Sequence, residues 1–314
     1  MREFLEIRDK ILESDNIVVV SHVNPDGDAI GSGLALTLGL RKIGKKVRFI
    51  LQDKYPDNIS YLKDLKSIEQ YDETKEYDFN LVICVDGATD DRLGDAKALL
   101  KNRFVINFDH HISNTMYGDL NCVTEISSTS ELIYKFLKFC GIEIDIDMAE
   151  ALYTGLVNDT GNFTHNNVTT ETFEMASELK RVGVDNSKIV REFFNTKTLA
   201  AIKLLGKAMY DMEYNEEKKL VYYFMSRAEL DRFNGRKEDT EGIVERLIAL
   251  KEAEVSLFLR EDKVGVIKGS MRSKHDVDVN EIASIFNGGG HRKAAGFTSE
   301  LPAEEIIKIV LEKL

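Results

Sequence analysis

Residues 16–28 read NIVVVSHVNPDGD, an apolar run that ends in a loop rich in histidine and aspartate. The first six residues predict a buried strand, because a short β-branched run bounded by polar residues is typical of one. The loop then offers His22, Asp26 and Asp28, while Gly27 relieves the tight backbone between the two aspartates. This stretch therefore predicts a strand followed by a loop that carries possible metal ligands.

Two further apolar runs end in the same way. Residues 81–85 (LVICV) precede Asp86, and the run FVINF precedes Asp109, His110 and His111. In a parallel α/β sheet every strand delivers the residues that follow it to the same carboxyl edge, where such folds bind ligands. We therefore expect the clusters to converge. Converging carboxylates repel one another, and carboxylates mixed with neutral imidazoles suit divalent cations better than a salt bridge.

Most of these residues have a simpler structural explanation when taken alone. A helix cap would explain Asp28, and a turn would explain Asp86, which precedes a glycine. A helix terminus would explain Asp159 in the sequence GLVNDTGNF. The histidines favour the metal site, because a cap does not require one. His165, just downstream of Asp159, is interpreted as a surface or supporting residue and not as a ligand.

A second candidate site lies at residues 287–297, which read NGGGHRKAAGF. Exposed backbone N–H groups of the glycine-rich turn at Gly288, Gly289 and Gly290 would cradle a phosphate, and His291 could contact it directly. A flexible loop is the alternative explanation for a glycine triplet. The two cations that follow the histidine favour anion binding.

A nearby arginine is a further candidate for the same site. Residues 269–274 read GSMRSK and follow a strand-like run, so that Arg272 could serve as a planar donor to a second phosphate or a carboxylate. An exposed strand end explains this segment nearly as well.

The composition is that of a soluble globular protein. The chain has 314 residues, of which 43% are hydrophobic and 31% are charged. A net charge of -12 disfavours binding to duplex nucleic acid, which depends on many Lys and Arg contacts, although bound cations would still admit small anionic substrates. Three cysteines without paired spacing indicate reduced thiols, and no apolar stretch is long enough to span a membrane. We expect a cytoplasmic protein without membrane attachment.

The order of the segments predicts an α/β fold with two domains. An N-terminal parallel sheet with helices on both faces is expected in residues 1–190, a helical linker in 191–214 and a smaller α/β domain with a mixed sheet in 215–314. The clearest elements are a helix that starts after Asp28 and ends at Gly44, a strand at 46–51, helices at 128–140, 147–156 and 169–183, and strands at 220–225, 254–259 and 263–268.

These motifs together resemble the DHH phosphoesterase superfamily with a C-terminal DHHA1 domain. The resemblance is strongest to the NrnA-type family of nano-RNases and 3′-phosphoadenosine 5′-phosphate (pAp) phosphatases. It covers almost the entire chain and rests on five motifs in this order: HVNPDGDAIGS, VDGATDDRLG, NFDHHISN, GLVNDTGNF and GGGHRKAAGF.

The resemblance implies a role for each candidate residue. Two Mn²⁺ ions are expected, with Mg²⁺ or Co²⁺ as possible substitutes. The implied ligands are His22 and Asp26 for one ion, Asp28, His110 and Asp159 for the other, and Asp86 as the bridge. His111 would contact the scissile phosphate and Asp109 would orient neighbouring ligands. The substrate's other phosphate would be bound by Arg272, Ser273, Gly288, Gly289, Gly290 and His291.

The implied activity is two-metal hydrolysis of short single-stranded oligoribonucleotides to mononucleotides and of pAp to AMP. A homodimer is a reasonable expectation. Hydrolysis of linear or cyclic dinucleotides, such as pApA and cyclic di-AMP, is the nearest alternative at the same site. A non-catalytic nucleotide sensor is the alternative from another class, and the intact set of ligands disfavours it. The GGGH sequence argues against a family II pyrophosphatase, and the acidic, short chain argues against a RecJ-like exonuclease.

Overall fold

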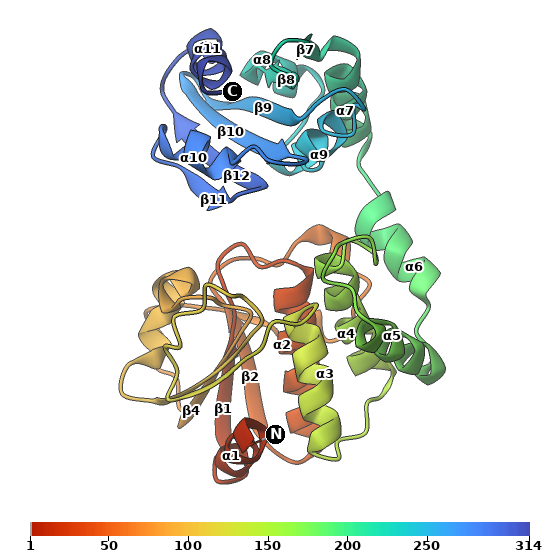
Figure 1. Ribbon diagram of the computed structural model, residues 1–314. Helices are drawn as coiled ribbons and strands as arrows, with labels where there is room; N and C mark the ends of the chain where they lie inside the picture. Colours follow the sequence, from red (N-terminus) through yellow and green to blue (C-terminus); the bar gives the residue numbers. More distant parts are fainter. Residues whose placement is uncertain (1) are drawn as a thin grey trace. The chain divides into compact units, whose positions relative to one another are not determined.

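The computed structural model describes residues 2–314 and separates into two compact units (Figure 1). The first unit ends at Thr196, and the second unit is Lys197–Leu314. Each unit has its own sheet and its own core.

The first unit is built on a six-stranded sheet in which all neighbouring strands are parallel. The strand order is β3-β2-β1-β4-β5-β6, so that the chain moves outward from β1 in one direction and then returns to continue from β4 in the other. The carboxyl ends of β1 and β4 therefore form the switch point at which open α/β sheets bind ligands. The strands are β1 (Asn16–Val20), β2 (Lys46–Leu51), β3 (Glu69–Gln70), β4 (Leu81–Val85), β5 (Phe104–Asp109) and β6 (Leu120–Val123).

The two faces of this sheet are covered differently. Ile17 and Val19 of β1 point into the main core with the α-helices, whereas Val18 and Val20 face a smaller cluster formed with the 3₁₀ segment η3 (Asp90–Leu100). On the helical face, α2 packs against both α3 and α4 (Figure 1). The remaining elements are α1 (Arg2–Leu12), α2 (Gly27–Lys42), α3 (Thr129–Phe139), α4 (Ile146–Asp159), α5 (Thr170–Val182), α6 (Asn186–Val190), the π-helical η4 (Arg191–Asn195) and the short 3₁₀ turns η1 (Asp57–Ile59) and η2 (Leu65–Ser67).

The second unit has a mixed sheet in the order β11-β12-β10-β9-β8-β7. The pair β8–β9 is parallel and the other pairs are antiparallel. Its strands are β7 (Glu213–Asn215), β8 (Leu220–Met225), β9 (Val255–Lys263), β10 (Val266–Ser273), β11 (Gly289–His291) and β12 (Ala294–Ser299), and its helices are α7 (Leu199–Asp211), α8 (Arg227–Arg232), η5 (Lys237–Thr240), α9 (Ile243–Leu247), α10 (Val279–Ser284) and α11 (Ala303–Lys313).

The predicted fold class is confirmed, with a parallel sheet followed by a mixed one. Within the segment 191–214, expected as a helical linker, the structure has η4, a break at 196–198, then α7 and the start of β7. The predicted glycine-rich turn is wrong, because Gly289–His291 is the edge strand β11, paired with β12. Among residues 2–314, no helix has both the length and the apolar character needed to cross a membrane.

Candidate metal centre

Asp86 lies among three histidines at the carboxyl ends of β1, β4 and β5. Its carboxylate oxygens are 3.5 Å from His22 Nε2, 3.6 Å from His110 Nε2 and 3.8 Å from His111 Nδ1. Asp86 is only 3% exposed. The convergence expected from the sequence is therefore present, and Asp86 is at its centre.

The backbone at Asp86 is unusual. Its φ is 58°, a left-handed conformation that aspartate tolerates better than most residues but that still carries strain. The Asp86 N–H donates to Phe108 O of β5 at 3.0 Å, and the Thr129 hydroxyl donates to Asp86 Oδ1 at 3.0 Å. These contacts hold the carboxylate in place at the end of β4.

Two of the histidines present the same ring nitrogen to the carboxylates. His22 Nδ1 lies 2.8 Å from Val23 O, and His110 Nδ1 lies 3.3 Å from Ile126 O. A backbone carbonyl accepts from Nδ1–H, so that in the neutral ring Nε2 is left as an acceptor. This arrangement is the one that metal-binding histidines usually adopt.

Asp28 is fully buried and is held by the first turn of α3. Its Oδ2 accepts from Thr129 N at 2.7 Å and its Oδ1 accepts from Ser130 N at 2.9 Å. Space for this carboxylate comes from Gly155 of α4, because a Cβ there would overlap Asp28 Oδ1 and Ser130 Oγ. The idea of Asp28 as the helix cap is wrong, since Asp26 caps α2 and accepts from the N–H groups of residues 28 and 29.

Three groups of side chains could each hold a metal ion, with ligand atoms within 4.8 Å of one another in each group. The shared members are Asp86 and His110, and His110 Nε2 is also 3.0 Å from Asp159 Oδ2. The groups are His22, Asp26 and Asp86; Asp28, His110 and Asp159; and Asp86, His110 and His111.

The pKa values of Asp28 and His110 are both raised in this cluster of buried carboxylates. Burial, followed by the charges of Asp159 and Asp86, raises the pKa of Asp28 well above its usual range. Burial alone would lower the pKa of His110, but the hydrogen bond to Asp159 and the surrounding carboxylates outweigh it and raise this pKa. Asp28 and His110 therefore retain their protons more readily than usual. A divalent cation would displace these protons, so this set of carboxylates and imidazoles fits such a cation.

His111 is oriented by a buried carboxylate. Asp109 is fully buried and its Oδ1 lies 2.7 Å from His111 Nδ1, which leaves Nε2 as the ring's other polar atom. Asn114 Nδ2 donates to the second oxygen of Asp109 at 2.6 Å. His165 lies outside the metal groups, but its Nδ1 is 2.9 Å from the carbonyl oxygen of Asp159.

The candidate phosphate-binding residues belong to the second unit. Arg272 of β10 is opposite Ala294 of β12, which in turn is opposite His291 of β11. Directly opposed residues of a sheet have side chains on the same face, so Arg272 and His291 lie on one face of this sheet. Gly289, two residues before His291 on β11 and opposite Gly296, lies on that face as well. We call this the β10–β12–β11 face.

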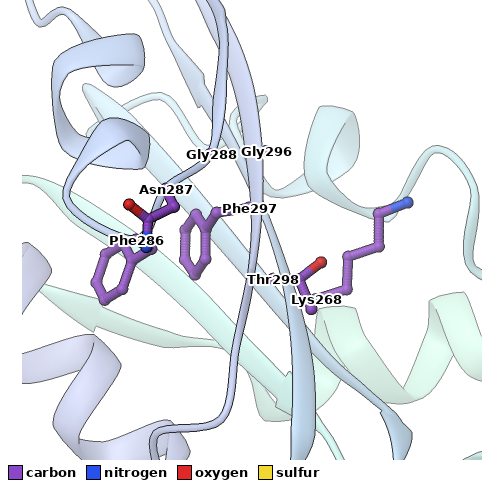
Figure 2. A pocket seen from close by; sticks show the side chains of 7 residues that line it. All are labelled: Lys268, Phe286, Asn287, Gly288, Gly296, Phe297 and Thr298. Carbon is purple, nitrogen blue, oxygen red and sulfur yellow. The ribbon is translucent and has the colours of Figure 1, made fainter.

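Some residues expected to bind phosphate have other contacts in this unit or lie on the other face of its sheet. Ser273 donates its hydroxyl to Val277 O at 2.7 Å, and Arg272 donates to Glu245 at 2.7 Å. Gly290 belongs to the opposite face, where a Cβ would overlap Ala294 O. A hollow of about 420 Å³ lies beside β10, β12 and the segment between α10 and β11 (Figure 2). It is lined by Lys268, Phe286, Asn287, Gly288, Gly296, Phe297 and Thr298.

Sequence reasoning missed Thr129 and Asn114. Thr129 donates its N–H to Asp28 and its hydroxyl to Asp86, and so links carboxylates of two metal groups. The polar sequence SSTSE at 127–131 in front of an apolar helix would have suggested a capping segment but not this link. Asn114 ends the motif NFDHHISN, where its place beside Asp109 could only be found in three dimensions.

Comparison with known proteins identifies the family. Residues 16–156 match the DHH family, N-terminal domain, and residues 217–314 match the DHHA1 domain. The chain is 30% identical over 300 residues to the bifunctional oligoribonuclease and PAP phosphatase NrnA of Thermus thermophilus, with 94% of this chain and 88% of that protein covered. For the NrnA of Bacillus subtilis, identity is 31% over 286 residues, with 90% and 88% covered.

A solved structure agrees with this result. The crystal structure of an exopolyphosphatase-related protein from Bacteroides fragilis matches with a TM-score of 0.94 and 31% identity, over 99% of this chain and 96% of that one. The chain therefore belongs to the DHH phosphoesterases with a DHHA1 domain, and within them to the NrnA type. It is a hydrolase of phosphoester bonds, and the resemblance drawn from its motifs is confirmed.

Proposed function

We propose that this protein hydrolyses short oligoribonucleotides to mononucleotides and pAp to AMP, with two Mn²⁺ ions in the first unit. The convergence of carboxylates and imidazoles on Asp86 carries the proposal. The relatives named oligoribonuclease and PAP phosphatase, which are 30% and 31% identical to this chain, support the choice of substrate.

The proposed ligands divide into two sets that share Asp86. His22 and Asp26 belong to one ion, and Asp28, His110 and Asp159 to the other. When bound, such cations supply an activated water near neutral pH and neutralise charge that develops on the phosphoryl oxygens. A donor set of carboxylates and imidazoles suits Mn²⁺, with Mg²⁺ or Co²⁺ as substitutes.

The remaining residues of the site bind and orient the substrate. His111, held through Nδ1 by Asp109, would contact the scissile phosphate through Nε2. In the second unit, Arg272 and His291 would bind the other phosphate from the β10–β12–β11 face, with Gly289 leaving room for its approach. Arg272 would then exchange or share its contact with Glu245.

A substrate panel tests the proposal. The purified protein is treated with a chelator, supplied with Mn²⁺, Mg²⁺ or Co²⁺, and given pAp, pApA, cyclic di-AMP and RNA from dinucleotide to decanucleotide. We expect hydrolysis of pAp and of the shortest RNAs, with initial rates that fall as the RNA lengthens and with Mn²⁺ giving the highest rates. Faster hydrolysis of pApA or cyclic di-AMP would favour the dinucleotide alternative. Tight binding without any hydrolysis would favour a sensor.

Replacement of Gly289 by alanine tests the phosphate site separately. The added Cβ would meet only Asn280 Oδ1 at 3.7 Å, so the fold should tolerate it. The methyl group would occupy the space through which the phosphate approaches, and we expect KM for pAp to rise about tenfold, or about 1.4 kcal/mol. The comparison variant is Gly290→Ala, which should lower the melting temperature because its Cβ overlaps Ala294 O. An unchanged KM for pAp in a stable Gly289→Ala protein would show that Gly289 does not belong to the substrate site.

A further inference from the structure

We propose that Asn114 is a positioning residue that fixes the His111 ring through the buried carboxylate of Asp109. This inference rests on the proposed function, in which His111 contacts the scissile phosphate. The hydrogen bonds of Asn114 go to Asp109, to Asn107 and to the backbone of neighbouring residues, and none of them involves a proposed metal ligand.

The chain turns back on itself to bring Asn114 to this position. The Asn114 N–H donates to His111 O at 3.1 Å and closes a turn directly after the histidine pair. Its side-chain Nδ2 then donates to Asp109 Oδ2 at 2.6 Å and to Gly87 O at 3.3 Å. One amide thus joins the end of β5 to the residue that follows Asp86 at the end of β4.

The amide of Asn114 is held in a single orientation. Its Oδ1 accepts from Met116 N at 2.7 Å and from Asn107 Nδ2 at 3.1 Å. With two donor and two acceptor contacts, it makes all the hydrogen bonds that an amide side chain can make. A flipped amide would place its oxygen against the Asp109 carboxylate, so the observed orientation is strongly preferred.

Asp109 depends on this contact because it is fully buried. One of its carboxylate oxygens pairs with His111 Nδ1 at 2.7 Å, and the other pairs with Asn114. Loss of the amide would leave a buried carboxylate oxygen without its donor, and the carboxylate would rotate to find another partner. The imidazole would then lose the fixed direction that it needs to bind phosphate.

A mutant cycle tests this chain of contacts. We expect Asn114→Ala to lower kcat for pAp by roughly 10- to 100-fold, as for other residues that orient a functional group, with little change in KM. The isosteric Asn114→Asp should be at least as damaging, because it replaces the donor by a second carboxylate. In a His111→Ala background, Asn114→Ala should have little further effect, since the ring on which it acts is gone.

A matched control separates positioning from loop stability. Asn121 Nδ2 donates to Met116 O and Gly118 O, so it supports the same loop without touching Asp109. We expect Asn121→Ala to keep near-normal kcat. If Asn121→Ala reproduces the loss, or if Asn114→Ala keeps wild-type kcat, the assignment is overturned. The assignment is also overturned if Asn114→Ala lowers kcat by the same factor in the His111→Ala background as in the wild type.

Two measurements do not depend on catalysis. In the metal-free protein, the NMR signal of the His111 Nδ1 proton, assigned by its absence in His111→Ala, should shift or vanish in Asn114→Ala and remain in Asn121→Ala. Mn²⁺ titration should give the same stoichiometry in the wild type and in Asn114→Ala. A wild type without hydrolytic activity would refute the proposed function alone, whereas an unchanged proton signal would refute the role of Asn114.

Discussion

Replacement of Asp86 by asparagine is expected to reduce phosphoester hydrolysis on the order of 10³-fold or more, beyond the usual loss of a single electrostatic contact. Asp86 touches all three histidines of the centre and belongs to two of its three metal groups. Burial would raise its pKa, but the hydrogen bond to His22 and the histidine charges lower it to about 2. Its negative charge is therefore present at every pH at which the enzyme would be assayed.

The asparagine variant should still fold. Asparagine, like aspartate, tolerates the left-handed φ of 58°, and its amide oxygen can still accept from the Thr129 hydroxyl. The matched control is Asp91→Asn, because Asp91 lies nearby on the surface with its side chain 85% exposed. Initial rates with pAp, Mn²⁺ binding by calorimetry and thermal unfolding would be compared. Wild-type rates in Asp86→Asn, with Asp91→Asn equally active, would refute the assignment of Asp86 as a shared ligand.

Replacement of Gly155 by alanine is expected to damage both the fold and the site. The new Cβ would overlap Ser130 Oγ and Asp28 Oδ1, both of which are confined by the first turn of α3. Overpacking of this kind typically costs about 1–3 kcal/mol of unfolding free energy. Because the displaced oxygen belongs to Asp28, we also expect activity and Mn²⁺ affinity to fall.

Gly206 offers the matched comparison within another helix. It lies exposed on α7, and a Cβ there would meet no heavy atom within 4 Å in the described part of the chain. Gly206→Ala should therefore stabilise the protein by about 0.5–1 kcal/mol through helix propensity alone. Chemical denaturation and pAp hydrolysis of both variants provide the test. If Gly155→Ala remained as stable and as active as Gly206→Ala, the close packing around Asp28 would have no functional importance.

The sequence predicted β1, β2, β4 and β5 of the first sheet because their apolar runs are local signals, but it missed the short strands β3 and β6. The run at 46–51 is β2 as expected, and the helix predicted at 169–183 is α5 with Thr169 and Gly183 as its caps. The turn between the last two predicted strands was misplaced, since β9 continues to Lys263 and β10 begins at Val266. Charged residues continue an exposed strand as readily as they form a turn. Composition alone therefore could not locate the turn between β9 and β10.

The site was predictable as a set of residues but not as a network. Strand ends and histidines identified Asp86 and its neighbours, because parallel strands place their ends together. The contacts of Thr129 with Asp28 and Asp86 join positions 101 and 43 residues apart in the chain. Such contacts depend on how α3 packs beside α2, and no short motif encodes that packing.

The switch point between β1 and β4 has a consequence for how the protein matures. The side chains around it come from the segment after β1, the ends of β4 and β5, and the end of α4. None of the three metal groups can form within one of these segments, so a partly synthesised or partly folded chain lacks the complete site. The group of Asp28, His110 and Asp159 forms only when α4 has docked, so metal binding at this group would report that the first unit has reached its native state.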